Sequence, residues 1–358
     1  MPTNELYHTW IAQIRELHDA KRITQIRNFV WLMIGIYKSR SVHLSKVAGK
    51  IPGRAVVLST TRRLSRFLDN TDIQVREWYE PVAREWLNAQ ASWIGQIRLI
   101  IDGSKVGFGH QLLMVSIAYR KRAIPIAWTW VKHVRGHSTA SKQIALLAYV
   151  KKLIPPKTPV FLVGDTEFGS ITAIKQLKKW RWFYVLRQKT NTLVRVGRHR
   201  TWQAFGTHIQ KSDQRVWLGP GDLTQQSACP TSLLLYWQIG QKEPWCLATN
   251  LSNPSIALQH YKRRMWIEEM FGDMKKHGFN LESSMLHTFQ RLSRLTLAVA
   301  FLYAWLVSTG VRTIHAGFRY LVDCKSRRDL SVFQIGFRYI QRRLVNALSI
   351  SSPLCSYL

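Results

Sequence analysis

Acidic residues are scarce in this sequence, and cysteines and long apolar runs are few. The 358 residues include 20 Asp plus Glu against 52 Lys plus Arg, which is untypical of an enzyme for small acidic substrates. The four cysteines include no C-x-x-C pair, so neither a zinc knuckle nor a disulfide framework is indicated, and a reducing cytosol fits. The longest apolar stretch, residues 295–311, falls short of the ~20 residues that span a bilayer and predicts a buried helix. No secretion signal is recognisable, so we expect a cytoplasmic protein without a membrane partner.

The charge and the apolar content together define the broad class of protein. The formal net charge is +32, while 46% of the residues are hydrophobic and 11% are aromatic. The chain therefore has enough apolar material to bury a core, which excludes a disordered basic tail. A folded protein with this charge attracts polyanions and releases their counterions. DNA or RNA is thus the expected partner, well ahead of an anionic membrane surface.

Residues 1–95 predict a small helical DNA-binding domain. Apolar residues recur at helical spacing along this segment, and a Pro-Gly turn at residues 52–53 interrupts them. Arg62, Arg63 and Arg66 cluster after that turn, in a segment that could fold as helix, turn, helix. A helix end rich in arginine suits contacts with DNA, and a plain solvated helix face explains the same residues about as well.

The pattern of the sequence changes after residue 95. Five short runs rich in β-branched and aromatic residues predict strands at 97–102, 111–119, 123–131, 159–165 and 182–188. A helix is predicted from Ser138 to Leu153, with Ser138 as its cap, and another is expected after Gly169. Three strands followed by helix, strand, helix and strand is the order of an RNase H-like α/β domain.

The expected fold class is therefore α/β, with an RNase H-like catalytic core, a mainly β insertion and an N-terminal helical domain. The insertion is expected at residues 189–258, where Gly, Pro, Gln and alternating stretches break the earlier rhythm. The core is then formed in two parts, by residues 96–188 and 259–311. Residues 312–358 carry eight basic and two acidic side chains and predict a basic C-terminal extension, either DNA-facing or solvated.

Two carboxylates follow very apolar runs. Asp102 comes directly after RLII, and Asp165 comes directly after VFLVG, at positions where α/β sheets place ligand groups. A carboxylate in such a setting needs a counter-charge, and Mg²⁺ supplies one because it binds through one or two carboxylates plus substrate phosphates. The alternative is that each aspartate caps the turn or helix that follows it.

A third carboxylate is expected on a helix over residues 261–275. At about 100° per residue, four polar residues share a stripe beside the apolar face that would dock on the sheet: Tyr261, Arg264, Glu268 and Lys275. Glu269 and Asp273 point elsewhere, so Glu268 is the predicted partner of the two aspartates. The alternative is a salt-bridged surface ridge, because Arg264 and Glu268 are four residues apart.

Three carboxylates around two divalent ions can carry out phosphoryl transfer. One ion activates a water molecule or a 3′-hydroxyl, and the other stabilises the leaving oxygen. The predicted catalytic and metal-binding residues are Asp102, Asp165 and Glu268, with two Mg²⁺ ions as the expected cofactor and Mn²⁺ as a substitute for them. The surrounding basic charge would hold the phosphates while the metal ions act.

With these residues in place, the sequence resembles the DDE transposases of bacterial insertion sequences, specifically the insertion-sequence-4-like group with the Tyr-x₂-Arg-x₃-Glu-x₆-Lys signature. Tyr261, Arg264, Glu268 and Lys275 fit that spacing without gaps. The resemblance covers about residues 60–310. It implies a DNA transposase, that is, a polynucleotidyl transferase and endonuclease, in the cytoplasm of a bacterium and associated with the nucleoid.

The resemblance also implies a mechanism and partners. Cut-and-paste movement would begin with nicking at the terminal inverted repeats of an element, pass through a DNA hairpin, and end with strand transfer into target DNA. The partners would be double-stranded DNA and a second copy of the chain in the synaptic complex. Tyr261, Arg264 and Lys275 would hold phosphates near the cleaved end. Trp245 would stack on a base flipped out of the hairpin.

Two other functions share part of these features. A general RNase H-like nuclease or resolvase would use the same carboxylates without joining strands. A non-enzymatic basic DNA-binding protein would bind DNA in a salt-dependent manner without metal-dependent strand breakage. Glu167, close to Asp165 in the sequence, has no role in any of these interpretations.

Overall fold

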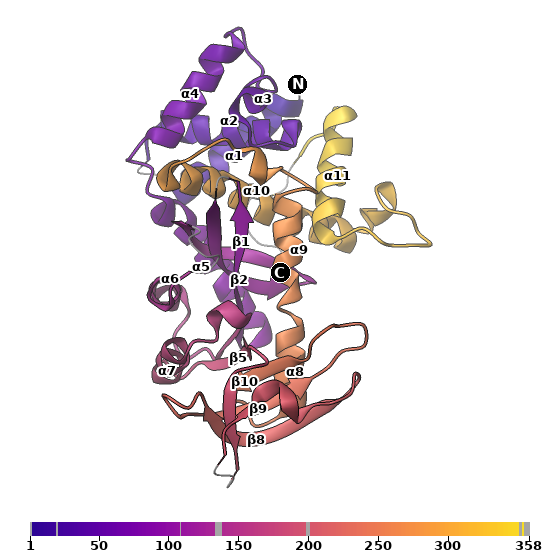
Figure 1. The fold of residues 1–358 in the computed structure, drawn as a ribbon. Coiled ribbons are helices and arrows are strands. Elements are labelled where there is room, and N and C mark those ends of the chain that lie inside the picture. Colours follow the sequence, from indigo (N-terminus) through magenta and orange to yellow (C-terminus); the bar gives the residue numbers. More distant parts are fainter. Residues whose placement is uncertain are drawn as a thin grey trace.

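The computed structural model describes residues 2–18, 21–107, 109–132, 138–197, 201–350 and 353. This part of the chain is a mixed α/β protein built on one large sheet, with a group of helices at one end and a strand-rich region at the other (Figure 1). Its strands are β1 Ile97–Val106, β2 His110–Tyr119, β3 Arg122–Lys132, β4 Val160–Gly164, β5 Phe183–Gln188, β6 Leu193–Val196, β7 Gln203–Ala204, β8 Arg215–Leu223, β9 Cys229–Tyr236 and β10 Trp245–Thr249.

The strands are arranged in the order β3-β2-β1-β4-β5-β10-β9-β8-β6-β7. β1, β4 and β5 run parallel, while β2 and β3 continue the sheet from β1 in antiparallel fashion. The five strands predicted between residues 97 and 188 are confirmed, although β1 is longer than its apolar run because residues 103–106 remain paired with β2. Strands β6 to β10 fall within residues 189–258 and extend the same sheet through the antiparallel β5-β10 pair.

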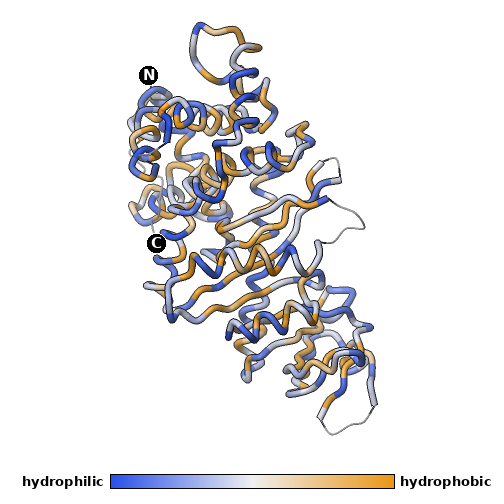
Figure 2. The backbone as a smooth tube through the Cα atoms, turned by 90° about the vertical axis from the view of Figure 1, so that its left-hand side faces the viewer, coloured by the Kyte–Doolittle hydropathy of each residue, from blue (hydrophilic) through white to orange (hydrophobic). Residues whose placement is uncertain are grey.

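Helices enclose the central strands. α6 contacts both α5 and α7, while α8 packs against β4 and β5, and α9 packs against β1, β2 and β3. Apolar residues therefore run almost continuously along the central strands, and they alternate with hydrophilic ones along the helices (Figure 2). The helices are α1 Pro2–Leu17, α2 Ile23–Ser39, α3 Leu44–Ala48, α4 Val57–Asp69, α5 Val75–Ile94, α6 Ala140–Leu153, α7 Ile171–Lys179, α8 Pro254–Lys262, α9 Met265–Met274, α10 Phe289–His315 and α11 Val332–Val345, with 3₁₀ turns at Thr166–Phe168, Phe205–His208, Leu281–Ser283 and Phe318–Leu321.

Helix α10 lies at the centre of the hydrophobic core. Trp10 of α1 meets Trp305 edge-on with ring centroids 4.7 Å apart, and Phe29 of α2 meets Phe301 at 5.2 Å. Within the described chain, α10 is the one helix long and apolar enough to cross a membrane, yet 89% of its most apolar stretch is buried inside the protein. The buried helix predicted around residues 295–311 is thereby confirmed as a core element.

The C-terminal segment differs from the solvated or DNA-facing extension that its charge predicts. α11 packs along α10, with Gly310 and Gly336 at the crossing, where either Cβ would clash with a backbone carbonyl of the facing helix. The Tyr37 hydroxyl of α2 donates to the Phe337 carbonyl at 2.9 Å. Phe333 and Ile340 of α11 are buried, so the apolar face of this basic helix belongs to the core. The net charge of the segment did not reveal this packing, because the arginines occupy the opposite face of α11.

Candidate active site

The strand register aligns the two predicted aspartates. Ile101 of β1 and Gly164 of β4 are the last paired residues of these parallel strands, so Asp102 and Asp165 follow at neighbouring positions on one face of the sheet. The pairing of β4 with β5 continues this row to Arg187, whose Nη1 lies 3.8 Å from Oδ1 of Asp165. Sequence reasoning overlooked Arg187, although its place near the end of a parallel strand was the available signal.

Neither aspartate caps a helix. Asp102 lies within β1, where its Oδ1 accepts a hydrogen bond from the Gly103 N–H at 2.7 Å. Asp165 precedes the 3₁₀ turn Thr166–Phe168, and its side chain makes no capping hydrogen bond within the described residues. The capping alternative therefore does not account for these two residues.

The single helix predicted over residues 261–275 is wrong. α8 ends at Lys262 and α9 begins at Met265, with a turn at residues 263–264 between them, so one helical wheel does not span the segment. Arg264 stands at the N-cap of α9, Glu268 lies in its first turn, and Lys275 is the residue that ends it. No proline or glycine marks this break, which explains why helical spacing did not reveal it.

The three predicted acids converge on Arg264. Its Nη1 lies 3.1 Å from Oδ2 of Asp102 and 4.0 Å from Oδ2 of Asp165. Its Nη2 lies 2.6 Å from Oε1 of Glu268. Residues that are separated by more than 160 positions in the sequence are thus gathered around one guanidinium group. The Arg264–Glu268 ion pair of the ridge alternative exists, but only Glu268 reaches the surface, since its side chain is 46% exposed and that of Arg264 is 9% exposed.

The neighbouring acids of α9 serve a different contact. Asp273 accepts a hydrogen bond from Nε of Arg122 at 2.8 Å, and Glu269 lies 3.4 Å from the same guanidinium group. Both acids therefore point to β3 and away from Asp102, which agrees with the choice of Glu268. Asp273 is buried, and this makes it a useful comparison for the acids that surround Arg264.

The carboxylates around Arg264 are suitable ligands for a hard divalent cation. Carboxylate oxygens are the ligands that Mg²⁺ and Mn²⁺ prefer. Oδ1 of Asp165 is buried and accepts no hydrogen bond from any residue that the structure describes, and its ion-pair partner, Nη1 of Arg187, is 3.8 Å away. The described residues contain no group of three His, Cys, Asp or Glu side chains already spaced to hold a metal ion. The carboxylates are therefore suitable ligands for a divalent cation, but their present spacing is set by the Arg264 guanidinium group that lies between them.

Tyr261 and Trp245 lie beside the acids. Tyr261 is 2% exposed and meets Trp245 edge-on with ring centroids 5.0 Å apart. Burial raises the pKa of Tyr261 well above its ordinary value, and the Asp165 and Asp102 charges raise it further against the opposing effect of Arg264. Its hydroxyl has no hydrogen-bond partner among the described residues. Trp245 is partly buried at the start of β10, so base stacking by this residue stays a prediction.

Replacing Tyr261 by Phe should leave thermal stability unchanged, whereas Tyr261→Ala should lower the free energy of unfolding by about 3–5 kcal/mol. The reason is that the buried hydroxyl has no partner to lose in the described structure, while the ring fills core space. Thermal and denaturant unfolding measure both effects. A marked loss of stability in Tyr261→Phe would show that the hydroxyl is bonded in the protein, contrary to this arrangement.

Lys275 and the α4 arginines lie farther out. The Lys275 ammonium group donates to the Lys105 carbonyl and lies 3.0 Å from Oε1 of Glu282, so it joins the end of α9 to β1. Arg62 and Arg66 are exposed on α4, and Arg63 is half-buried there. The structure does not bring these arginines into the acidic site, which leaves them as candidates for a separate DNA contact.

Glu167 has a structural role that the sequence did not reveal. Its Oε1 accepts hydrogen bonds from the Ser138 N–H at 2.7 Å and the Ser138 hydroxyl at 2.5 Å. Ser138 is therefore not the cap of α6, and Thr139 occupies that position with its side chain accepting from the Lys142 N–H. The contact ties the start of α6 to the turn after β4.

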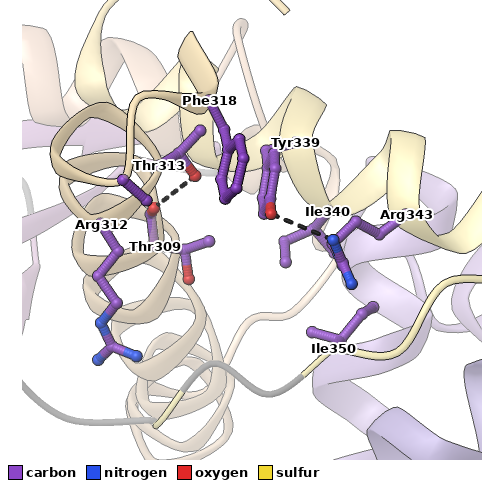
Figure 3. Close-up of a pocket in the computed structure, with 9 residues that line it drawn as sticks. Thr309, Arg312, Thr313, Phe318, Tyr339, Ile340, Arg343 and Ile350 are labelled. Carbon is purple, nitrogen blue, oxygen red and sulfur yellow. Dashed lines mark hydrogen bonds between the residues drawn. The ribbon is translucent and has the colours of Figure 1, made fainter. Parts of the chain in front are cut away.

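A separate pocket of about 300 Å³ lies between α10 and α11 (Figure 3). Phe318 and Tyr339 stand nearly parallel at its edge, with ring centroids 6.4 Å apart. Arg343 donates to the Tyr339 hydroxyl at 3.2 Å. The pocket contains none of the three predicted acids, so it is distinct from the site around Arg264.

A strongly basic α/β protein with carboxylates gathered at strand ends has the make-up of an enzyme that acts on nucleic-acid phosphates. A family model described as the transposase DDE domain matches residues 66–305, which is about two thirds of the chain. The chain therefore belongs to the DDE transposase family. This family indicates an enzyme that cleaves DNA and transfers strands, and such transposases generally depend on divalent metal ions.

No curated protein matches this sequence. Among solved structures, the cryo-EM structure of the piggyBac transposase synaptic complex with hairpin DNA is similar to this chain, with 11% sequence identity and a TM-score of 0.42. The similarity covers 98% of this chain and 84% of that chain.

Proposed function

We propose that this protein is a transposase of the insertion-sequence-4-like group that excises a mobile element at its terminal inverted repeats and joins it to target DNA by cut-and-paste through a hairpin. The observation that carries the proposal is the convergence of Asp102, Asp165 and Glu268 on one point of a DDE transposase domain. Together with Tyr261 and Lys275 at the signature spacing, this favours catalysis over a purely DNA-binding role.

The proposed catalytic core is RNase H-like. The strand order β3-β2-β1-β4-β5, with β2 antiparallel to β1, supports this assignment. The core would comprise residues 96–188 and 259–311, with β6 to β10 as its insertion and residues 1–95 as the DNA-binding region. Residues 312–358 would form a basic extension whose apolar face is anchored on α10.

In this proposal Asp102, Asp165 and Glu268 hold two Mg²⁺ ions, for which Mn²⁺ can substitute. When bound, these ions would activate water or a 3′-hydroxyl and stabilise the leaving oxygen. The side chains of the protein would position the DNA and supply positive charge next to its phosphates. Arg187 and Arg264 stand next to the acids and are suited to hold phosphate oxygens, since guanidinium groups bind phosphates through paired hydrogen bonds.

Further contacts with double-stranded DNA would come from outside the acid cluster. Lys275 would contact a phosphate near the cleaved end, and Trp245, beside Tyr261, would stack on the flipped base. The exposed arginines of α4 would contact the inverted repeat. A second copy of the chain would hold the other end of the element in a homodimeric synaptic complex.

The decisive experiment uses a plasmid that carries the reading frame's own flanking DNA as the donor. Purified protein with Mg²⁺ should release a fragment that ends at short inverted repeats and join it to a second plasmid. Sequencing of the junctions measures both events. Metal-dependent cutting without joined products would favour a nuclease or resolvase, and salt-dependent binding without any metal-dependent cutting would favour a non-enzymatic DNA-binding protein.

Metal affinity should decrease below neutral pH. Burial raises the pKa of Asp102 to about 7 against the opposing charge of Arg264, and the charges of Asp165 and Glu268 add to the rise. Below this pH a proton occupies the carboxylate and competes with the cation, so the affinity for Mn²⁺ should decrease by up to about tenfold per pH unit. Calorimetric titration between pH 6 and 8 measures this. An affinity that does not change over this range would contradict the expectation.

A further inference from the structure

The position of Arg264 conflicts with metal binding by the same oxygens. Nη1 of Arg264 faces Oδ2 of Asp102 at 3.1 Å and Oδ2 of Asp165 at 4.0 Å, so one nitrogen atom occupies the point at which the two carboxylates meet. Mg²⁺ binds its oxygen ligands at about 2.0–2.1 Å, which is much closer than a guanidinium group spaces them. The carboxylates cannot therefore hold a cation between them while Arg264 remains in this place.

Arg264 is placed so that its contacts with the acids can be replaced by contacts with a phosphate. The Arg264 side chain is buried, yet its strongest contacts are to the predicted metal ligands, with Nη2 2.6 Å from Oε1 of Glu268. Its Nε is buried and has no hydrogen-bond partner within the described part of the chain. The residue stands in the turn between α8 and α9, so its long side chain can rotate without unwinding either helix. An arriving phosphodiester offers a guanidinium group an equivalent pair of oxygen acceptors.

We propose, on the basis of the function proposed above, that Arg264 is a built-in counter-ion that competes with divalent cations for Asp102, Asp165 and Glu268 until a DNA phosphate takes the guanidinium group away. Without DNA, the guanidinium group neutralises acids that would otherwise repel one another. With DNA, it binds the phosphate and leaves the carboxylates to the cation. The binding of metal and the binding of DNA are then mutually favourable, because each removes the competitor of the other.

The first test measures Mn²⁺ binding in the absence of DNA. Arg264→Gln removes the charge of the counter-ion and should raise the affinity for Mn²⁺ by on the order of tenfold or more. Arg264→Lys retains a positive charge and should stay close to the wild-type affinity. Arg122→Gln is the matched control, because it removes another arginine that pairs with acids of α9, outside the cluster, and should leave Mn²⁺ affinity unchanged.

Thermal stability supplies a readout that is independent of metal binding. Without metal, Arg264→Gln should melt below the wild type because three acids lose their counter-ion, and Mn²⁺ should restore more stability to it than to the wild type. An Arg264→Gln affinity for Mn²⁺ equal to or below that of the wild type would overturn the counter-ion proposal. If Asp102→Asn also bound Mn²⁺ as the wild type does, the proposed metal site itself would be wrong, so the two failures are distinguishable.

The second test measures DNA binding to a duplex of the inverted repeat, with Ca²⁺ as a cation. Ca²⁺ should tighten binding of the wild type by about 5-fold or more, which is the usual range of coupling between two sites. Ca²⁺ should have a much smaller effect on DNA binding by Arg264→Gln, because in this variant no guanidinium group has to leave the acids. Equal effects of Ca²⁺ on both proteins, or no effect on the wild type, would overturn the exchange onto phosphate.

Discussion

Asp102→Asn should reduce metal-dependent DNA cleavage and strand transfer by on the order of a thousandfold, the scale on which removing one preorganised charged group acts in enzymes. Asparagine preserves the size of the side chain but removes the negative charge that faces Arg264 and the predicted cation. DNA binding, measured by fluorescence anisotropy, should be retained because the surface keeps its large positive charge. The loss should appear in single-turnover cleavage with either Mg²⁺ or Mn²⁺.

Asp273→Asn is the matched control for this substitution. The Asp273 side chain is 4% exposed, against 15% for Asp102, and it pairs with an arginine at 2.8 Å, but that arginine is Arg122, outside the acid cluster. We expect Asp273→Asn to lower thermal stability and to retain cleavage. Comparable losses of cleavage in both variants would mean that any acid of this region is needed for folding, and full activity in Asp102→Asn would refute the catalytic role proposed for it.

Gly336→Ala should lower the free energy of unfolding by about 1–3 kcal/mol, and Gly336→Leu should prevent α11 from docking. The reason is the close crossing of α10 and α11, at which a Cβ on Gly336 would clash with the Leu306 carbonyl oxygen. Urea unfolding of the purified protein measures the change. Gly49→Ala is the matched control, since a Cβ there meets its nearest atom at an ordinary 3.5 Å. Equal stability of Gly336→Ala and the wild type would contradict the helix crossing.

The sequence was most informative where local pattern and topology agree. Short β-branched runs identified the central strands because strands buried on both faces are nearly continuous in apolar residues. Asp102 and Asp165 could be found because each follows such a run, and parallel neighbouring strands bring their carboxyl ends together. Each aspartate could be found without knowing which strands pair, whereas their meeting depends on the parallel pairing of β1 with β4.

Other features depend on contacts that no local pattern encodes. The break between α8 and α9 falls in a segment without glycine or proline, where helical spacing continues on both sides. The Glu167–Ser138 bond joins residues whose pairing depends on the register of β4 and the start of α6. Arg264 was predicted to hold DNA phosphates, and its contact with three acids follows only from the turn that directs it against β1.

Helix α10 has a consequence for attempts to shorten this protein. Its aromatic side chains are covered by α1 and α2 from the opposite end of the chain, while α11 closes another side. A truncated fragment that starts at residue 96 would leave Phe301 and Trp305 facing water. Expression of such a fragment should therefore give an insoluble product, and the helices before residue 96 are expected to fold with the rest of the chain as one cooperative unit.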